Sequence, residues 1–189
     1  MAERQYGTLE EIRADHVNRY RFAVNHIGSG KRVLDAACGC GYGSRMLQDA
    51  GNKVVGVDIC PEAILYAGEH YNGVGYLLSD IRDKPWVGMF DAIVSFETIE
   101  HLPEGSLRLF RESVDGVFIC SVPNQDSYPF VAENFARDVY PHLRHYTPFE
   151  FDEVLAQAGF KVTERYCQKS KKGEVVEGTD GMFLVYICQ

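Results

Sequence analysis

Apolar and polar positions change their spacing along the chain in a regular way. From about residue 32 onward, short apolar runs rich in β-branched residues alternate with longer stretches of helical periodicity. The runs are continuously apolar rather than alternating, which is typical of strands buried on both faces of a parallel sheet. We therefore predict parallel strands over residues 32–36, 53–59, 76–80, 91–96 and 116–122.

Helices are expected between these strands. They are predicted over 44–50, 61–71 and 102–114, and the second begins with a proline, which favours the first turn of a helix. Residues 81–89 contain Pro85 and are too few for a full helix. An amphipathic helix is predicted over 9–27, with one apolar face that includes Ile12, Val17, Tyr20 and Val24.

The last third of the chain has a different character. Residues 124–146 are rich in aromatic residues, Asn and His and lack periodicity, and long irregular segments in compact domains are usually lids or binding loops. A helix over 147–158 is predicted next, with Thr147 and Glu150 at capping-box spacing and Gly159 at its end. Two further strands, joined by a turn rich in Gly and Lys, predict an antiparallel hairpin over 161–168 and 182–188.

The order of these elements predicts an α/β fold. Its core is a doubly wound, Rossmann-like sheet of seven strands, mostly parallel with an antiparallel C-terminal hairpin. The length of 189 residues suits a single domain over 1–189. Within it, we expect 1–29 to supply a helix that covers the ligand site and 124–146 to form a substrate loop.

Composition narrows the classes of partner and location. The net charge is −8 and the dense basic cluster is Lys169, Lys171 and Lys172, which argues against nucleic acid as a partner. No apolar run is long enough for a membrane span and the polar N-terminus is unlike a secretory signal, so we expect a cytoplasmic protein. The six cysteines form no C-x-x-C pair and mostly lie in apolar runs, which predicts buried thiols rather than disulfides or zinc ligands.

The most informative segment is 33–44, with the sequence VLDAACGCGYGS. A strand ends in an acid, Asp35, and a loop with three alternating glycines then leads into a helix. Glycines let the backbone approach a ligand, and ligands of doubly wound sheets bind beyond the carboxyl ends of the strands. A glycine loop alone also fits dinucleotide-binding folds. The carboxylate of Asp35, however, would repel a pyrophosphate and suits the ammonium group of a methionine moiety.

Acids also end the next two strands. Asp58 ends the second, where a carboxylate can accept hydrogen bonds from both hydroxyls of a ribose. Asp80 ends the third, where it can accept a hydrogen bond from the amino group of an adenine while Ile81 packs on the ring. Taken alone, each acid fits a cap or turn as well, and for Asp80 the alternative is capping of the turn before Pro85.

With these residues in this order, the chain resembles the class I S-adenosylmethionine-dependent methyltransferases. The glycine loop resembles the first motif of that family, Asp58 its acidic second motif and Asp80 its adenine-binding motif. FDAIVSFETIEHL at 90–102 resembles its fourth-strand motif, and SVPN at 121–124 resembles the end of its fifth strand. Residues 111–116 read RESVDG instead of the common Lys-Pro-Gly-Gly turn, which affects the substrate side rather than the cofactor side.

The resemblance implies a cofactor and the residues that hold it. The cofactor is S-adenosyl-L-methionine, released as S-adenosyl-L-homocysteine, and the acceptor is a small molecule, sugar or lipid methylated on oxygen or nitrogen. Arg19 lies in an HxxRY pattern similar to small-molecule and glycan-associated methyltransferases, and either binds the methionine carboxylate or is a solvated helix arginine. The implied cofactor residues are Arg19, Asp35, Ala37, Gly39, Gly41, Asp58, Ile59, Asp80, Ile81 and Phe96.

Two histidines are candidates for catalysis. His101 follows the fourth strand in an ending that resembles ubiquinone-type O-methyltransferases, and it either takes the proton of a hydroxyl acceptor or is structural. His142 lies in an HxxxYT pattern similar to the family, together with His145. This segment either contacts substrate, or Tyr146 has a packing role and His145 is exposed to solvent. No metal site is expected, because Asp91 begins its strand, at the opposite end from Glu97 and Glu100.

Two other functions fit the same fold. A nucleotide-dependent oxidoreductase would need a substrate domain for which the chain has no room. A non-catalytic S-adenosylmethionine-binding protein, acting as a partner subunit, would be expected to have a degenerate cofactor loop, whereas this loop is intact. The sequence therefore favours an active methyltransferase.

Overall fold

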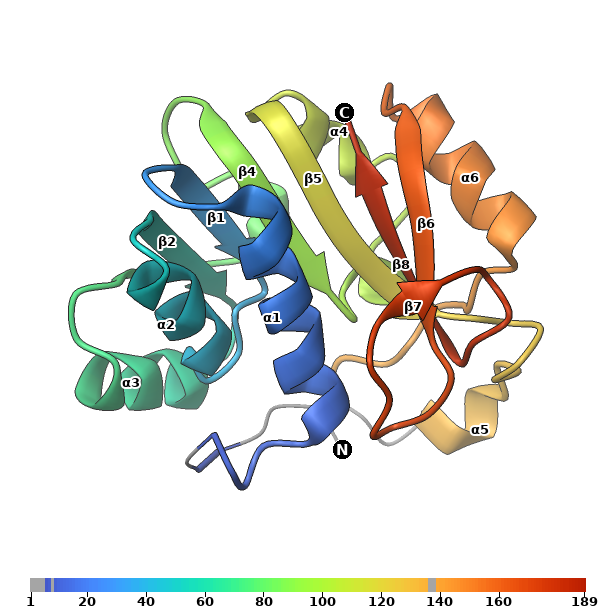
Figure 1. Ribbon diagram of the computed structural model, residues 1–189, viewed down its shortest axis with the longest axis horizontal. Coiled ribbons are helices and arrows are strands. Elements are labelled where there is room, and N and C mark those ends of the chain that lie inside the picture. The colour runs from blue at the N-terminus through green and yellow to red at the C-terminus, as the bar shows by residue number, and fades with distance from the viewer. Residues whose placement is uncertain (1–5, 8, 136–138) are drawn as a thin grey trace.

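The computed structural model describes residues 6, 7, 9–135 and 139–189 (Figure 1). Residues 1–5 and 8 of the predicted N-terminal segment, and 136–138 of the predicted substrate loop, lie outside this description. Within the described residues, eight strands form one sheet in the order β3-β2-β1-β4-β5-β8-β6-β7.

The parallel part of the sheet agrees closely with the predicted runs. Neighbouring strands pair in parallel across this part, which consists of β1 (Arg32–Ala36), β2 (Lys53–Asp58), β3 (Gly75–Leu78), β4 (Phe90–Phe96) and β5 (Val114–Pro123). The doubly wound α/β class is therefore confirmed. One detail differs, because β3 is at the edge of the sheet and its Leu78 is 54% exposed rather than buried.

The C-terminal strands are antiparallel, as predicted. β8 (Phe183–Cys188) lies between β5 and β6 (Val162–Gln168) and pairs antiparallel with both. The expected number of seven strands is one too few, because the Gly- and Lys-rich connection contains a two-residue strand, β7 (Val176–Glu177), paired with the end of β6.

Helices cover both faces of the sheet (Figure 1). One apolar cluster joins Tyr20 and Leu47 of the first two helices to Val33 and Val94 of the sheet. A second cluster joins Leu34 and Ile93 to later helices, and alternate residues of β1 and β4 thus face opposite layers. The helices are α1 (Ala14–Ile27), α2 (Tyr42–Asp49), α3 (Pro61–His70), α4 (Leu107–Arg111), α5 (Ala132–Phe135) and α6 (Pro148–Gln157), with single 3₁₀ turns η1 (Ile81–Asp83) and η2 (Ile99–His101).

Helix boundaries show where the sequence prediction was too long. The helix predicted over 9–27 begins only at Ala14, because Arg13 has an extended backbone. The helix predicted over 102–114 shrinks to α4, because Gly105 takes a positive φ of 85° that a helix cannot accommodate. In α6 the predicted capping box is present, with the Thr147 side chain accepting from the Glu150 amide at 3.2 Å.

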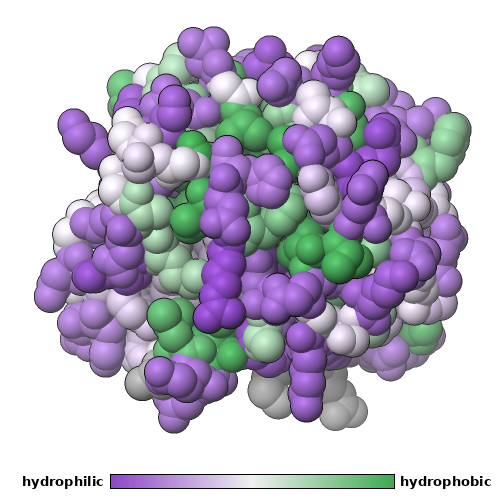
Figure 2. Space-filling model, in the orientation of Figure 1, coloured by the Kyte–Doolittle hydropathy of each residue, from purple (hydrophilic) through white to green (hydrophobic). Residues whose placement is uncertain are grey.

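The surface and the cysteines agree with the composition of the chain. The face in Figure 2 is mostly hydrophilic, with hydrophobic side chains in small separate groups rather than one wide patch. Every cysteine is a free thiol and all but Cys60 are buried, as predicted. Among the helices of the described residues, none is long and apolar enough to cross a membrane.

Candidate functional site

A cavity of about 590 Å³ opens at the carboxyl ends of the parallel strands. This is the edge at which doubly wound sheets bind ligands. Ten of the predicted site residues line it, namely Arg19, Ala37, Gly39, Asp58, Ile59, Asp80, Ile81, Phe96, His101 and His142. Asp35 and Gly41 do not line it, so a direct contact of these two with a ligand is not what the structure presents.

The glycine loop is held against the end of β2 by Asp58. The Gly39 amide donates to Oδ2 of Asp58 at 2.9 Å, and the Cys60 amide donates to Oδ1 at 2.9 Å. Gly41 lies behind the loop with a φ of 85°, where a Cβ would be 2.6 Å from the Cβ of Ala67. These contacts fix the loop so that its backbone faces the cavity.

Ala37 has a strained backbone conformation that the sequence did not reveal. Its φ is 65°, in the left-handed region that glycine adopts at little cost, and it lines the cavity. Strained non-glycine residues persist only where the surrounding structure holds them, which is common at ligand sites. The only sequence signal for this position is that an alanine, rather than a glycine, stands just before the glycine pattern.

Asp35 lies beneath the loop rather than on the cavity wall. It is buried, and its two carboxylate oxygens accept hydrogen bonds from the Tyr20 hydroxyl at 2.9 Å and the Ser44 hydroxyl at 2.6 Å. Burial raises the pKa of Asp35 to about 7, against the lowering effect of these two hydrogen bonds. Asp35 thus ties α1, through Tyr20, to the start of α2.

Asp80 caps a turn, one of the two roles that the sequence left open, and it also lies on the cavity wall. Its carboxylate caps η1 by accepting from the Arg82 amide at 2.9 Å and is also ion-paired with the Arg82 guanidinium. Hydrogen bonding from the Arg82 side chain lowers the pKa of Asp80, so the group is a carboxylate at neutral pH. Asp80 and the buried Ile81 nevertheless both line the cavity.

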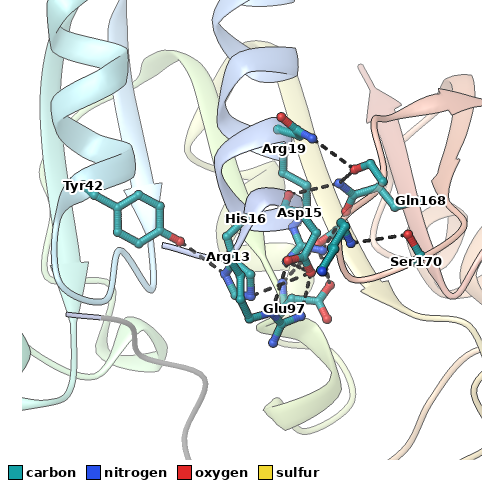
Figure 3. Close-up of polar contacts among 12 residues, drawn as sticks. Arg13, Asp15, His16, Arg19, Tyr42, Glu97, Gln168 and Ser170 are labelled. Carbon is teal, nitrogen blue, oxygen red and sulfur yellow. Dashed lines mark hydrogen bonds and ion pairs between the residues drawn. The ribbon is translucent and has the colours of Figure 1, made fainter. Parts of the chain in front are cut away.

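Arg19 is buried in full, which excludes the solvated alternative. It projects from α1 towards Asp15, Glu97 and Gln168 (Figure 3). Its Nη1 donates to Oε1 of Gln168 at 2.9 Å and lies 3.7 Å from the Glu97 carboxylate, while Nη2 lies 3.8 Å from Asp15. Within the described part of the chain, Nε and Nη2 of Arg19 have no hydrogen-bond partner. Because buried donors are costly to leave unsatisfied, Arg19 has the capacity to bind an anionic ligand group in the cavity.

His16 accompanies Arg19 on the same helix and also lines the cavity. Its Nδ1 lies 3.2 Å from the Tyr42 hydroxyl. Burial, and then the positive charge of Arg19, lower the pKa of His16 to about 2, so the ring is neutral at physiological pH. At this end of the cavity Arg19, unlike His16, therefore carries a positive charge.

The predicted catalytic histidines meet at the other end of the cavity. The rings of His101 and His142 have centroids 4.5 Å apart, and Nδ1 of His101 lies 3.1 Å from the Pro141 carbonyl. Nδ1 of His142 lies 2.9 Å from Nε2 of His145, whose own Nδ1 lies 2.6 Å from the Tyr128 carbonyl. His145 is only 5% exposed, so it is not a solvent-exposed histidine.

Glu100 lies close to His101 and His142. It is fully buried, and its main-chain carbonyl accepts from the Leu143 amide at 2.8 Å, which joins η2 to the 124–146 segment. One ligand atom from each of Glu100, His101 and His142 lies within 4.8 Å of the other two, a spacing that could hold a metal ion. Burial, followed by the charges of His101 and His145, lowers the pKa of His142 to about 3, so its ring is neutral.

Several residues in or around the cavity were not predicted as site residues. Gln168, fully buried at the end of β6, donates from Nε2 to the Asp15 carbonyl at 3.0 Å and thereby joins the last hairpin to α1. Phe135 stacks on His142 with ring centroids 4.1 Å apart, and Tyr128 and Tyr140 extend the same aromatic wall.

Comparison with known families gives a match over most of the chain. Residues 8–165 match the family model described as a methyltransferase domain. A probable S-adenosylmethionine-dependent methyltransferase from Mycolicibacterium smegmatis is 28% identical over 146 residues, which cover 74% of this chain and 55% of that protein. A ubiquinone biosynthesis O-methyltransferase from Aromatoleum aromaticum is 26% identical across 100% of this chain and 92% of its own length. The chain spans about half the length of the mycobacterial relatives that it matches.

Solved structures share the fold at low identity. The CcbJ methyltransferase from Streptomyces caelestis aligns with a TM-score of 0.73 and 16% identity, over 91% of this chain and 94% of that one. The 1,6-didemethyltoxoflavin-N1-methyltransferase from Burkholderia thailandensis aligns with a TM-score of 0.71 and 20% identity, over 90% of this chain and 75% of that one. These alignments support the fold of the chain.

Proposed function

The chain belongs to the methyltransferase domain family, and from this premise we propose that it transfers a methyl group from S-adenosylmethionine to a small-molecule, sugar or lipid acceptor. The methylated atom is an oxygen or a nitrogen, and the second product is S-adenosylhomocysteine. The observation that carries the proposal is that Asp58 and Asp80 at strand ends, the buried donors of Arg19 and two histidines all lie around one cavity.

The cofactor is proposed to lie along the carboxyl edge of the first three strands. Asp58 accepts the hydroxyls of the ribose, while Asp80 accepts the adenine amino group and Ile81 packs on the adenine ring. The oxygens of Asp58 already accept two main-chain amides, so they are fixed in place before the ribose binds. Ala37 and Gly39 let the loop backbone approach, and Ile59 and Phe96 supply apolar contact.

The methionine end is proposed to lie beside α1. Arg19 binds the α-carboxylate through the guanidinium donors that make no hydrogen bond within the described residues. The main-chain atoms of the glycine loop receive the ammonium group, while Asp35 acts from behind by fixing Tyr20 and the loop. Asp35 is thus a positioning residue for the cofactor, and Gly41 is needed because a side chain there would clash.

Methyl transfer then depends on aligning the acceptor with the methyl group. S-adenosylmethionine supplies an activated methyl on a sulfonium, so the chain mainly orients the nucleophile and excludes water. His101 lies on the wall where a hydroxyl of the acceptor would approach, and an imidazole there can accept the hydroxyl proton. His142, Phe135 and Tyr140 form the wall that would pack on the acceptor, which favours a planar or largely apolar molecule.

A turnover assay with a panel of acceptors tests this function. The purified chain is mixed with S-adenosylmethionine and either phenols, sugars, amines or phospholipids, and S-adenosylhomocysteine is measured together with the mass of the methylated product. We expect product from at least one hydroxyl acceptor, and we expect His101→Gln to slow it at least tenfold. The matched control is His26→Gln, an exposed histidine of α1, which should leave the rate unchanged.

The assay also separates the alternative function. If S-adenosylmethionine binds but no acceptor of any class raises S-adenosylhomocysteine above its background, the chain is a non-catalytic cofactor-binding protein and the proposal is wrong.

A further inference from the structure

Three potential metal ligands converge at the acceptor end of the cavity. One ligand atom from each of Glu100, His101 and His142 lies within 4.8 Å of the other two. Ligand atoms around a tetrahedral ion with bonds of about 2.1 Å lie roughly 3.4 Å apart, so small side-chain rotations would close this group around an ion. The His101 and His142 side chains line the cavity, whereas Glu100 is buried behind them.

The hydrogen bonds of the two rings direct their lone pairs. A carbonyl only accepts, so Nδ1 of His101 is the donor to Pro141 at 3.1 Å, which places the lone pair of the neutral ring on Nε2. For the same reason Nδ1 of His145 donates to the Tyr128 carbonyl, and Nε2 of His145 then accepts from Nδ1 of His142. The lone pair of His142 is therefore also on Nε2.

This pattern is the one found around metal-binding histidines. Such histidines donate their second ring nitrogen to a carbonyl or another acceptor, which fixes the ring and makes it a better ligand. Here both rings have such a support, one direct and one through His145. Two imidazoles and a carboxylate, with one ligand atom of each within 4.8 Å of the other two, bring three acceptors together, an arrangement that a cation stabilises.

We propose that Glu100, His101 and His142 form a binding site for one divalent transition-metal ion at the acceptor end of the cavity. Two imidazoles and one carboxylate suit Zn²⁺, Fe²⁺, Mn²⁺ or Co²⁺ rather than Mg²⁺ or Ca²⁺, which prefer oxygen ligands. With three protein ligands, the ion keeps at least one coordination position for a further ligand. The cavity side of the two histidines gives that position access to the acceptor.

This assignment differs from the sequence-based expectation of no metal site. That expectation considered the acids around the fourth strand and rejected a site because Asp91 lies at the far end of the strand. It could not include His142, because His142 is far from Glu100 in the sequence. The fold brings the two together, and the Leu143 amide donates to the Glu100 carbonyl at 2.8 Å.

The role of the ion rests on the proposed methyltransferase function. A hydroxyl oxygen of the acceptor that coordinates the ion loses its proton more easily, and the proton passes to water. The O–CH₃ bond then forms as the S–CH₃ bond breaks, and S-adenosylhomocysteine leaves. In this arrangement the ion replaces His101 as the group that activates the hydroxyl, and His101 is one of its ligands. The acceptor class narrows to hydroxyl compounds, best those with a second oxygen beside the hydroxyl.

Direct titration with Co²⁺ tests the site without cofactor or acceptor. The native chain is titrated with Co²⁺ under reducing conditions, and binding is followed by calorimetry and by visible absorption of the ion. We expect one ion per chain with a dissociation constant in the micromolar range or tighter. Zn²⁺ should displace the Co²⁺, and millimolar Mg²⁺ should not.

Variants locate the ion. Glu100→Gln and His142→Ala should each weaken Co²⁺ binding at least tenfold, whereas His70→Ala, an exposed histidine of α3, should bind as the native chain does. If Glu100→Gln and His142→Ala do not fold, Co²⁺ binding by His101→Ala tests the site instead, because the His101 side chain is only half-buried. Unfolding midpoints and S-adenosylmethionine affinity report whether each variant is folded.

The proposal is overturned if the native chain binds no Co²⁺ at a ratio of one to one, or if folded His142→Ala or His101→Ala binds it as tightly as the native chain. Either result leaves the methyltransferase proposal standing, because the titration contains no S-adenosylmethionine. Conversely, Co²⁺ binding with no turnover on any acceptor would contradict the proposed function and not the metal site.

Discussion

The two ends of the cavity are built in different ways. At the cofactor end, Asp58 and the glycine loop belong to strand ends that are adjacent in the sheet, and the Gly39 amide of the loop donates directly to the Asp58 carboxylate. At the acceptor end, His101 and His142 come from segments far apart in the sequence and are held by the Pro141 and Tyr128 carbonyls. A ligand site can thus be rigid through local geometry at one end and through long-range contacts at the other.

The difference suggests that the two ends can be disturbed separately. Changes beneath the glycine loop should affect folding and cofactor binding together, because Tyr20, Asp35 and Ser44 join α1 and α2 to the loop. Changes in the His142–His145 chain should affect the acceptor end and leave the cofactor end intact. The variants below test this separation.

The largest effect is expected from Gly43→Ala. A Cβ at Gly43 would be 2.0 Å from a ring carbon of Tyr20. Tyr20 is buried, and its hydroxyl donates a hydrogen bond to Asp35. Overpacking of this kind should lower the free energy of unfolding by about 3 kcal/mol or more. Denaturant unfolding measures it, with Gly68→Ala as the control, because a Cβ at Gly68 meets nothing within 4 Å and alanine favours the helix. Equal stability of Gly43→Ala and native protein would contradict the packing described here.

The second effect concerns pH and Asp35. Its pKa of about 7 in the folded state exceeds the value of about 3.9 expected in the unfolded chain. The folded protein therefore keeps a proton that the unfolded chain has released, so this group contributes fully below about pH 4 and its contribution is lost as the pH rises towards 7. Between these values the slope approaches ~1.4 kcal/mol per pH unit.

Asp35→Asn should remove that slope. Free energies of unfolding measured from pH 4.5 to 8 should fall less steeply for the variant than for the native chain. The control is Asp49→Asn, an exposed acid at the end of α2, which should keep the native slope. An unchanged slope in Asp35→Asn would show that Asp35 is not the group that holds the proton.

The third prediction addresses the acceptor end. His145→Ala removes the ring between the Tyr128 carbonyl and His142, and it leaves a buried gap. We expect the free energy of unfolding to fall by about 2 kcal/mol, from the lost hydrogen bonds and the cavity. The affinity for S-adenosylmethionine, measured by calorimetry, should stay within twofold of the native value. A large loss of cofactor affinity would mean that the two ends are not separable.

The smallest effect is expected at Ala37. Ala37→Gly relieves a positive φ that costs roughly 1 kcal/mol for alanine, and this gain is partly offset by the greater freedom of glycine in the unfolded chain. The net result should be a stabilisation of a few tenths of a kcal/mol. Ala36→Gly, one residue earlier in β1, lacks the strain and should instead destabilise the protein. Unfolding midpoints that change in the same direction for both variants would contradict the account.

The sequence predicted the cofactor end better than the acceptor end, and the reason is physical. Strand periodicity and the glycine loop are local, so Gly39, Asp58 and Asp80 could be assigned to one sheet edge. The roles of Tyr20 and Gln168 depend on contacts with residues far along the chain and have no local pattern. Asp35 was correctly read as a strand-end acid, but the side on which its carboxylate lies depends on Ser44 and Tyr20.

The same reasoning explains the errors in the elements. Helix 102–114 had good periodicity, but the positive φ of Gly105 delays its start to Leu107. The edge position of β3 follows from sheet order, which an apolar run does not encode. The acceptor end depends on how the 124–146 segment folds back onto η2, and nothing in its composition specifies the contact between Glu100 and Leu143.

Calorimetric titration of the purified chain with S-adenosylmethionine is the most direct test of the central claim. The account predicts micromolar binding to the native chain and to Asp91→Ala, an exposed acid near the other end of β4. It also predicts affinity weakened roughly 10- to 100-fold in Asp58→Ala, from the loss of charge-assisted hydrogen bonds, and no binding of NAD⁺. Preference for NAD⁺, or equal affinity of Asp58→Ala and the native chain, would contradict it.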